Sequence, residues 1–308
     1  MRTRVGLFLY VVIQLIEDVP VKRPTSFSEQ LDIMRSRGLY ISDHKNSLAI
    51  LERINYYRLS AYTLTIKNRQ TDIFFEGTKF EDIYGLYEFD RKIRHLLVGI
   101  LESIEIAFRT CVAYDLAHAF GSLGYMQGEN FVDESFHANL LSELEKSKSK
   151  NQEVFIDHHN KKYGGQFPIW VAVELMSFGT ISKLYSNLQD GEKQRIAKKY
   201  YGTSPAYLTT WIHTAVYIRN ICAHYGRLYN KSLKVSPKLH KRNKKLRLNK
   251  SLFSAIFVFR ELCRSTDEWN NFVTNLDAII DQYSCVIDLP KIGFPTEWEK
   301  ALRQQMNC

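Results

Sequence analysis

Glycine and proline are scarce in this chain, at 15 and 7 of its 308 residues. Both residues interrupt regular elements, so their scarcity leaves room for long helices. Strand-like alternation is also missing, except weakly in "TDIFFEG" at 71–77, and no solenoid-type repeat is visible. Apolar residues recur instead at intervals of three and four, so we predict an all-α fold.

Cysteines are few and widely separated. The five lie at positions 111, 222, 263, 285 and 308, and no two have the C-x-x-C or metal-ligand spacing of a zinc site. We therefore expect a reducing, cytoplasmic setting and a protein that uses no metal or other cofactor.

The chain also lacks a convincing membrane segment. The N-terminal "VGLFLYVVIQLI" follows two arginines, as a signal peptide would, but it has only twelve residues. A spanning helix needs about 20 apolar residues, and no small-residue cleavage site follows this run. We read residues 1–21 as a structured extension and expect no membrane partner.

Helix signals are clear along the rest of the chain. Thr25 or Ser26 is the expected N-cap of a helix that ends near Ser36 and stops at Gly38, and a second helix is expected after Asp43. The run from 78 to 120 predicts one or two long central helices.

"EKSKSKNQE" at 145–153 has the composition of a linker. His158 and His159 are adjacent and cannot share a helix face, so we expect solvated loop residues and not metal ligands.

Positive charge is in excess and unevenly placed. Lys and Arg number 42 against 33 Asp and Glu, a formal charge of +9, which favours anionic partners such as nucleic acid or a membrane surface. No acidic residue occurs between Tyr207 and Lys250. Basicity is therefore concentrated in one part of the chain.

Within that acid-free part, "YIRNICAHYGRLYNK" at 217–231 reads as an amphipathic helix. One arc of the helical wheel is expected to be apolar and to hold Ile218, Ile221, Cys222, Tyr225, Leu228 and Tyr229. The opposite arc is expected to hold Arg219, Asn220, His224 and Arg227. These polar residues are either the wet flank of a core helix or a site that handles phosphate. Histidine can pass protons near neutral pH, and arginine can hold a phosphate in two-pronged fashion, a combination suited to metal-free RNA cleavage.

The pattern R-N-x-x-x-H resembles the R-x4-6-H signature of HEPN ribonucleases. A larger resemblance is to the Abi-like abortive-infection family of phage-defence proteins, of the AbiD and AbiF kind. It is carried by these segments: "KRPTSFSEQLDIMRSRGLYISD", "INYYRLSAY", "GTKFEDIYGLYEFDRKIRHLLVGILESIEIAFRT", "WVAVELMSFGTISKLYSNL" and "VYIRNICAHYGRLYN".

The resemblance implies a HEPN-type helical bundle over 22–232 with additional N- and C-terminal helices. It also implies a metal-independent endoribonuclease that acts as a toxin-type effector against phage. Arg219 and His224 match the two defining positions of the motif, and Asn220 matches its polar second position. One motif per chain implies a homodimer, and relatives are associated with small noncoding RNAs. Some HEPN proteins only bind RNA, so a non-catalytic RNA-binding component of a defence system is the alternative.

Charged pairs in the long helical run have two readings. Asp90 and Arg94, like Glu105 and Arg109, stand one helical turn apart, and Glu102 precedes Glu105 by three residues. Intrahelical ion pairs are the simpler reading. Alternatively, Glu105 and Arg109 line the bundle next to the histidine and support the site.

Two further groups are candidate RNA contacts. Tyr56, Tyr57 and Tyr62 stand near Arg58, where they form either a base-stacking surface or part of the core. The segment at 233–308 begins with a basic linker before a C-terminal helical part. Its positive residues form either a solvated charge run or an electrostatic guide for RNA phosphates. The candidate RNA-binding residues are Arg227, Lys238, Lys241, Arg242, Lys244, Lys245 and Arg247.

Overall fold

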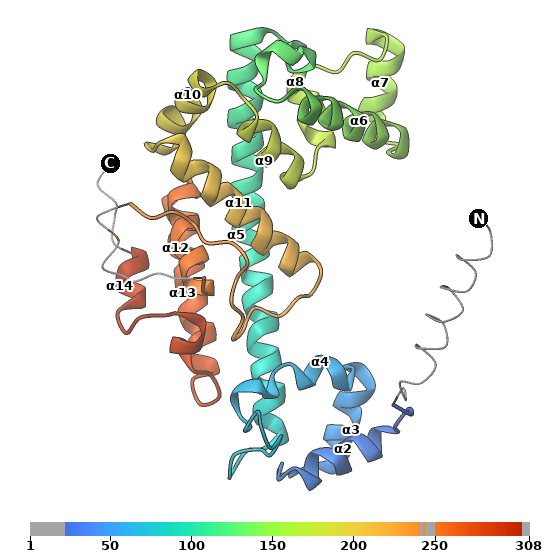
Figure 1. The fold of residues 1–308 in the computed structure, drawn as a ribbon, viewed down its shortest axis with the longest axis vertical. Helices are drawn as coiled ribbons and strands as arrows, with labels where there is room; N and C mark the ends of the chain where they lie inside the picture. The colour runs from blue at the N-terminus through green and yellow to red at the C-terminus, as the bar shows by residue number, and fades with distance from the viewer. Residues whose placement is uncertain (1–21, 241–242, 244–249, 304–308) are drawn as a thin grey trace, which may run out of the picture. The chain divides into compact units, whose positions relative to one another are not determined.

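The computed structural model describes residues 22–240, 243 and 250–303, and over these residues the chain is all-α (Figure 1). The predicted extension at 1–21 lies outside them. Within the described residues no strand forms, and the weak alternation at 71–77 yields only an isolated antiparallel bridge between Lys67 and Phe74. The fold class predicted from sequence is confirmed. The chain divides into two compact units between residues 83 and 84.

The first unit contains short helices and the first turn of a long one. Its elements are α2 (Phe27–Ser36), α3 (His44–Arg53), α4 (Tyr56–Ser60), the 3-10 turn η1 (Thr63–Thr65) and the start of α5 (Phe80–Phe120). Ser26 caps α2 through a capping box with Glu29, and the Asp43 carboxylate accepts from the Asn46 amide at 2.9 Å to cap α3. Both helix starts are therefore where the sequence predicts them.

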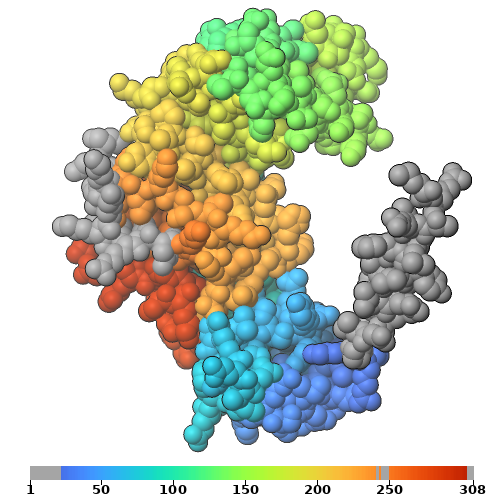
Figure 2. Space-filling view, viewed as in Figure 1, coloured from blue at the N-terminus to red at the C-terminus, as the bar shows by residue number. Residues whose placement is uncertain are grey.

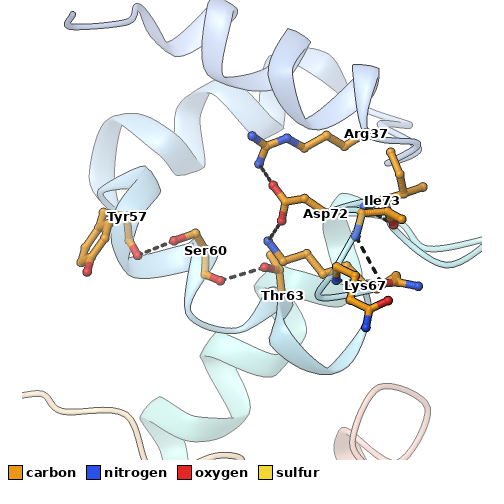
Figure 3. A network of polar contacts seen from close by, with 10 residues as sticks. Arg37, Tyr57, Ser60, Thr63, Lys67, Asp72 and Ile73 are labelled. Carbon is orange, nitrogen blue, oxygen red and sulfur yellow. Dashed lines mark hydrogen bonds and ion pairs between the residues drawn. The ribbon is translucent and has the colours of Figure 1, made fainter. Parts of the chain in front are cut away.

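A network of polar contacts organises the segment after α4 (Figure 3). Asp72 adopts φ 61° and pairs with Arg37 at 2.6 Å and with Lys67. The hydrogen bond from Lys67 is the main reason that the pKa of the Asp72 carboxyl lies below its usual value. The network includes two links at 2.8 Å each, from Ser60 Oγ to the Tyr57 carbonyl and from Thr63 Oγ1 to the Ser60 carbonyl. Side-chain hydrogen bonds thus hold a segment that has little regular structure.

The second unit is arranged around the rest of α5, which is a single helix of 41 residues. The other elements follow in chain order as η2 (Gly124–Met126), η3 (Gly128–Asn130), α6 (Glu134–Lys150), α7 (Val154–Tyr163), α8 (Ile169–Ala172), η4 (Val173–Leu175), α9 (Phe178–Ser186), α10 (Asp190–Tyr201), α11 (Pro205–Ala223), α12 (Leu252–Leu262), α13 (Thr266–Gln282), η6 (Leu289–Ile292) and α14 (Trp298–Arg303). Helix α11 packs against α9 and α12 (Figure 1).

The core of this unit follows from apolar periodicity. Leu86, Phe89, Ile93 and Leu97 form a fully buried stripe on α5, with the spacing of one helix face. Helix α12 is buried along almost its whole length, which is typical of a helix that is apolar all round. Helix α12 therefore offers α11 an apolar surface to pack against.

Helix replaces the linker and the loop predicted between 145 and 160. Helix α6 continues to Lys150, and His158 and His159 lie within α7, so the loop prediction is wrong. His159 is oriented by a 3.1 Å contact between its Nδ1 and the Gln166 carbonyl. Polar residues with helical spacing resemble a linker in sequence, because a solvated helix and a loop share their composition.

The described residues contain neither a metal-binding cluster nor a membrane-spanning helix. No group of three or more His, Cys, Asp and Glu side chains there is placed to hold a metal ion. No helix in the same part of the chain is both long and apolar enough to cross a membrane. The predicted division of the chain at residue 232 stays a prediction.

Candidate functional site

Helix α11 ends at the residues that the sequence singled out. It begins after Ser204 with Pro205 at its first position, and proline is well suited to the first turn. At the other end His224 is the C-cap residue. The Tyr225 amide donates to the Cys222 carbonyl at 3.1 Å, and the Gly226 amide donates to the Ile221 carbonyl at 2.8 Å. These two bonds form a Schellman motif, which closes a helix with one left-handed residue.

The left-handed residue is Tyr225, with φ 55°. The prediction of a helix that continues to Tyr229 is therefore wrong, as is the placement of Tyr225 on the apolar arc, because its side chain is 67% exposed. Glycine is needed one position later, since a Cβ on Gly226 would lie 3.0 Å from Ile221 Cγ2 and 3.2 Å from the Ile221 carbonyl oxygen. The turn thus projects an aromatic ring into solvent directly after His224.

Arg219 belongs to an ion-pair cluster with α5. Its Nε lies 3.5 Å from Glu105 Oε2, while Arg109 Nη2 donates to Glu105 Oε1 at 2.5 Å. Arg109 also donates to the Val173 carbonyl. The predicted Glu105–Arg109 pair is confirmed, and its carboxylate contacts Arg219. Two guanidinium groups share one carboxylate, so the cluster keeps a net positive charge.

Asn220 and His224 are exposed and lie one turn apart on α11. Arg219 and His224 differ by five positions, which puts them about 140° apart around the helix axis. The single polar arc predicted from the sequence therefore separates into an inner part, where Arg219 meets Glu105, and an outer part with Asn220 and His224. Burial raises the pKa of the neighbouring Cys222 thiol to about 12, so that thiol stays neutral.

The loop after His224 is anchored to α5 by Asp90, a contact that the sequence did not predict. Asp90 Oδ1 accepts from the Leu228 amide at 3.0 Å and from the Tyr229 amide at 2.6 Å, and its other oxygen pairs with Arg94. The predicted Asp90–Arg94 ion pair is confirmed, but both side chains are buried. The sequence does contain a signal for a buried partner of Asp90. This residue falls on the apolar stripe of α5, where an acid needs buried partners.

Arg227 and Tyr229 complete this anchored loop. Arg227 Nη1 donates to the carbonyls of Tyr229 at 2.7 Å and Asn230 at 3.2 Å. The Tyr229 hydroxyl accepts from the Asp288 amide at 3.0 Å, and its ring packs edge-on against Phe89. The guanidinium of Arg227, a predicted RNA contact, thus also holds the loop in shape.

The chain then runs back along α11 on the surface of the second unit, in the gold and orange atoms of Figure 2. The Lys234 amide donates to the Tyr217 hydroxyl at 3.3 Å, and the Lys238 carbonyl accepts from Trp211 Nε1 at 2.6 Å. From Trp211 to His224 a helix rises by about 20 Å. The exposed side chain of Lys238 therefore belongs to the end of α11 that is remote from His224.

Most of the predicted basic guide lies outside the described residues. Lys241, Arg242, Lys244, Lys245 and Arg247 are all in this group. The tyrosines of the predicted base-stacking surface do not share one environment. Tyr57 is 84% exposed, whereas Tyr62 is 2% exposed and belongs to the core of the first unit. Glu102 is exposed on α5.

Comparison with known proteins gives one match. The sequence profile of the Abi-like protein family matches residues 49–230, which is more than half of the chain. The matched range includes Asp90, Glu105 and the whole of α11 through the loop that follows His224. No curated protein and no solved structure matches the chain.

Proposed function

The chain belongs to the Abi-like protein family, and from this membership and the arrangement at the end of α11 we propose that it is a metal-independent HEPN endoribonuclease of bacterial phage defence. The observation that carries the proposal is the exposed His224 at a helix end closed by a Schellman motif, with Asn220 one turn away and Arg219 paired with Glu105. Acid is absent from 207 to 250, which suits a polyanionic substrate.

In the proposed reaction, a ribose 2′-oxygen attacks the adjacent phosphorus. A bond forms between these atoms, the bond from phosphorus to the 5′-oxygen breaks, and a 2′,3′-cyclic phosphate remains. A base takes the 2′-OH proton, and an acid gives a proton to the leaving 5′-oxygen. General acid–base help is worth about 10²–10⁴-fold, and a guanidinium stabilises the charge that develops on the phosphoryl oxygens. His224 and Arg219 have these chemistries.

Geometry supports a site completed by a second copy of the chain. One chain offers one motif histidine, whereas the reaction uses both a base and an acid. Arg219 and His224 also point about 140° apart around α11. The two side chains of one chain therefore do not readily converge on the same phosphate. In a symmetric dimer the two α11 ends would face each other and supply two histidines and two arginines.

The chemistry is tested with the purified protein and a labelled RNA. We expect cleavage to continue in EDTA and to leave 2′,3′-cyclic phosphate ends, and a DNA of the same sequence to stay intact, because it lacks the 2′-OH. Loss of cleavage on chelation, or equal cutting of DNA, would show that the proposed mechanism is wrong.

A second candidate function is binding without catalysis, in which the same helix end holds substrate or a small noncoding RNA. This function is favoured by the contacts of two arginines near His224. Arg219 pairs with Glu105 and Arg227 donates to loop carbonyls, so both guanidinium groups already have partners within the chain. Sequencing the RNA that co-purifies with wild-type protein and with His224→Ala separates the two. A nuclease yields fragments with common ends only in the wild type, and a binder yields the same RNA from both.

A further inference from the structure

A cavity of about 420 Å³ lies beside the loop that follows His224. Among the described residues it is lined by Asn230, Lys231, Ser232, Lys250, Ser251, Pro290, Lys291 and Gly293. Three chain segments therefore meet there, which are the loop after α11, the residues that lead into α12 and the turn η6. The volume is within the range of ligand sites, about 300–1,000 Å³.

The lining is positive and carries hydrogen-bond donors. Three of the eight lining residues are lysines, two are serines and none is acidic. Lys291 Nζ lies 3.1 Å from the carboxylate of Asp288, and this ion pair is partly exposed. Lysine ammonium groups are general phosphate binders. Three of them around one cavity make it suited to a phosphate group rather than an apolar ligand.

The walls of this cavity are tied to the candidate site and to each other. The Leu233 amide donates to the Lys250 carbonyl at 2.7 Å, which joins the first two segments. The Asp288 amide donates to the Tyr229 hydroxyl at 3.0 Å, and the Tyr229 amide donates to Asp90. Tyr229 thus connects the η6 wall with the loop that begins at His224, so the lysines and the histidine are held by one set of contacts.

We propose that Lys231, Lys250 and Lys291 form a pocket that binds a backbone phosphate of the RNA strand, next to the phosphate at His224. This inference rests on the proposed function, because it takes RNA as the ligand. From the pocket, Lys234 and Lys238 continue along α11 toward Trp211, and both are exposed. A single strand that follows this row would extend about 20 Å beyond the cleaved bond.

The test measures RNA binding in a His224→Ala background, where cleavage is not expected to consume the probe. A fluorescent single-stranded RNA is titrated at several salt concentrations with a variant carrying Lys231→Gln, Lys250→Gln and Lys291→Gln. The matched control carries Lys161→Gln, Lys162→Gln and Lys300→Gln, three exposed lysines on α7 and α14. Both variants lose three charges, so a difference between them reports position and not net charge.

The pocket variant is expected to bind RNA several-fold more weakly and to lower the log–log salt slope by about 0.7 for each phosphate that it no longer holds. The control is expected to keep the slope of its parent, and a Lys→Arg version of the pocket variant should keep it as well. Equal slopes for pocket and control variants overturn the inference, whether both fall or neither does. It is also overturned if inorganic phosphate protects the pocket lysines from acetylation while RNA does not. Failure of the cleavage assay removes the nuclease proposal and leaves this pocket standing.

Discussion

Tyr225 is a single residue whose backbone conformation carries a cost. A left-handed conformation costs a non-glycine residue about 1–2 kcal/mol, and such strain often marks functional positions. The Schellman motif at the end of α11 needs one left-handed residue, and glycine is the usual choice. Here the glycine is at 226 and a largely exposed tyrosine takes the left-handed position.

We expect Tyr225→Gly to leave the free energy of unfolding unchanged or to raise it by up to about 1 kcal/mol. The relief of strain is offset by the greater freedom of glycine in the unfolded chain. The same substitution should weaken RNA binding if the ring stacks on a base, at about 1–3 kcal/mol per base. Urea denaturation and RNA titration measure the two effects, with Tyr225→Phe as the control. Strong destabilisation by Tyr225→Gly would contradict the strain argument.

Asp90 anchors the loop after His224 to α5. Asp90→Ala removes one partner of a buried ion pair with Arg94 and the acceptor of two buried amides, so we expect a loss of about 3–5 kcal/mol in the free energy of unfolding. Asp157→Asn removes a carboxylate from an exposed ion pair with Lys161 and should cost less than about 1 kcal/mol. Equal urea midpoints for the two variants would mean that Asp90 is not an anchor.

At this scale the sequence predicts pairs close in the chain and misses distant ones. Glu105–Arg109 and Asp90–Arg94 follow from helical spacing and are present. The contact from Asp90 to Leu228 joins residues 138 positions apart, and local periodicity cannot place them together. The left-handed Tyr225 was missed because the sequence rules assign that conformation to glycine.

Among the elements, the segment after α4 shows how side chains replace regular structure. Its Asp72 carboxyl has a lowered pKa, chiefly because Lys67 donates to it. A carboxyl with a lowered pKa stabilises the fold above its ordinary pKa of about 4, and this contribution is lost as the pH falls through the lowered value. We expect hydrogen-exchange protection of residues 66–75 to drop in acid. Asp72→Asn should lower the protection at neutral pH and flatten its pH dependence, and an unchanged profile would exclude this role.

Helices are predicted best where an N-cap residue or a sustained apolar periodicity marks them in the sequence. Ser26 with Glu29 and Asp43 mark the starts of α2 and α3, and the sustained apolar period over 80–120 is one helix, α5. Helix α7 was missed, because its apolar stripe is short and only Ile156 is buried. Residues 231–240 are held along α11 by hydrogen bonds with Trp211 and Tyr217. No local sequence pattern connects these two residues with the lysines of the loop.

For the whole molecule we predict a symmetric dimer, because the proposed reaction needs a second α11 end. Light scattering at micromolar concentration should give twice the chain mass of 36.0 kDa. Mixing His224→Ala with Arg219→Ala should restore no more than part of the activity, since each mixed dimer still lacks one group of each kind. A monomer that cleaves RNA at the wild-type rate would contradict the paired site.

His224 is proposed to move protons in RNA cleavage, and a matched pair of histidine variants tests this role. His213 is also exposed and also lies on α11, but it is outside the motif. Single-turnover cleavage of a labelled RNA in EDTA should fall by about 10²–10⁴-fold in His224→Ala, with unchanged helix content and RNA affinity. His213→Ala should cleave at nearly the wild-type rate. Equal rates for the two variants would show that His224 is not catalytic.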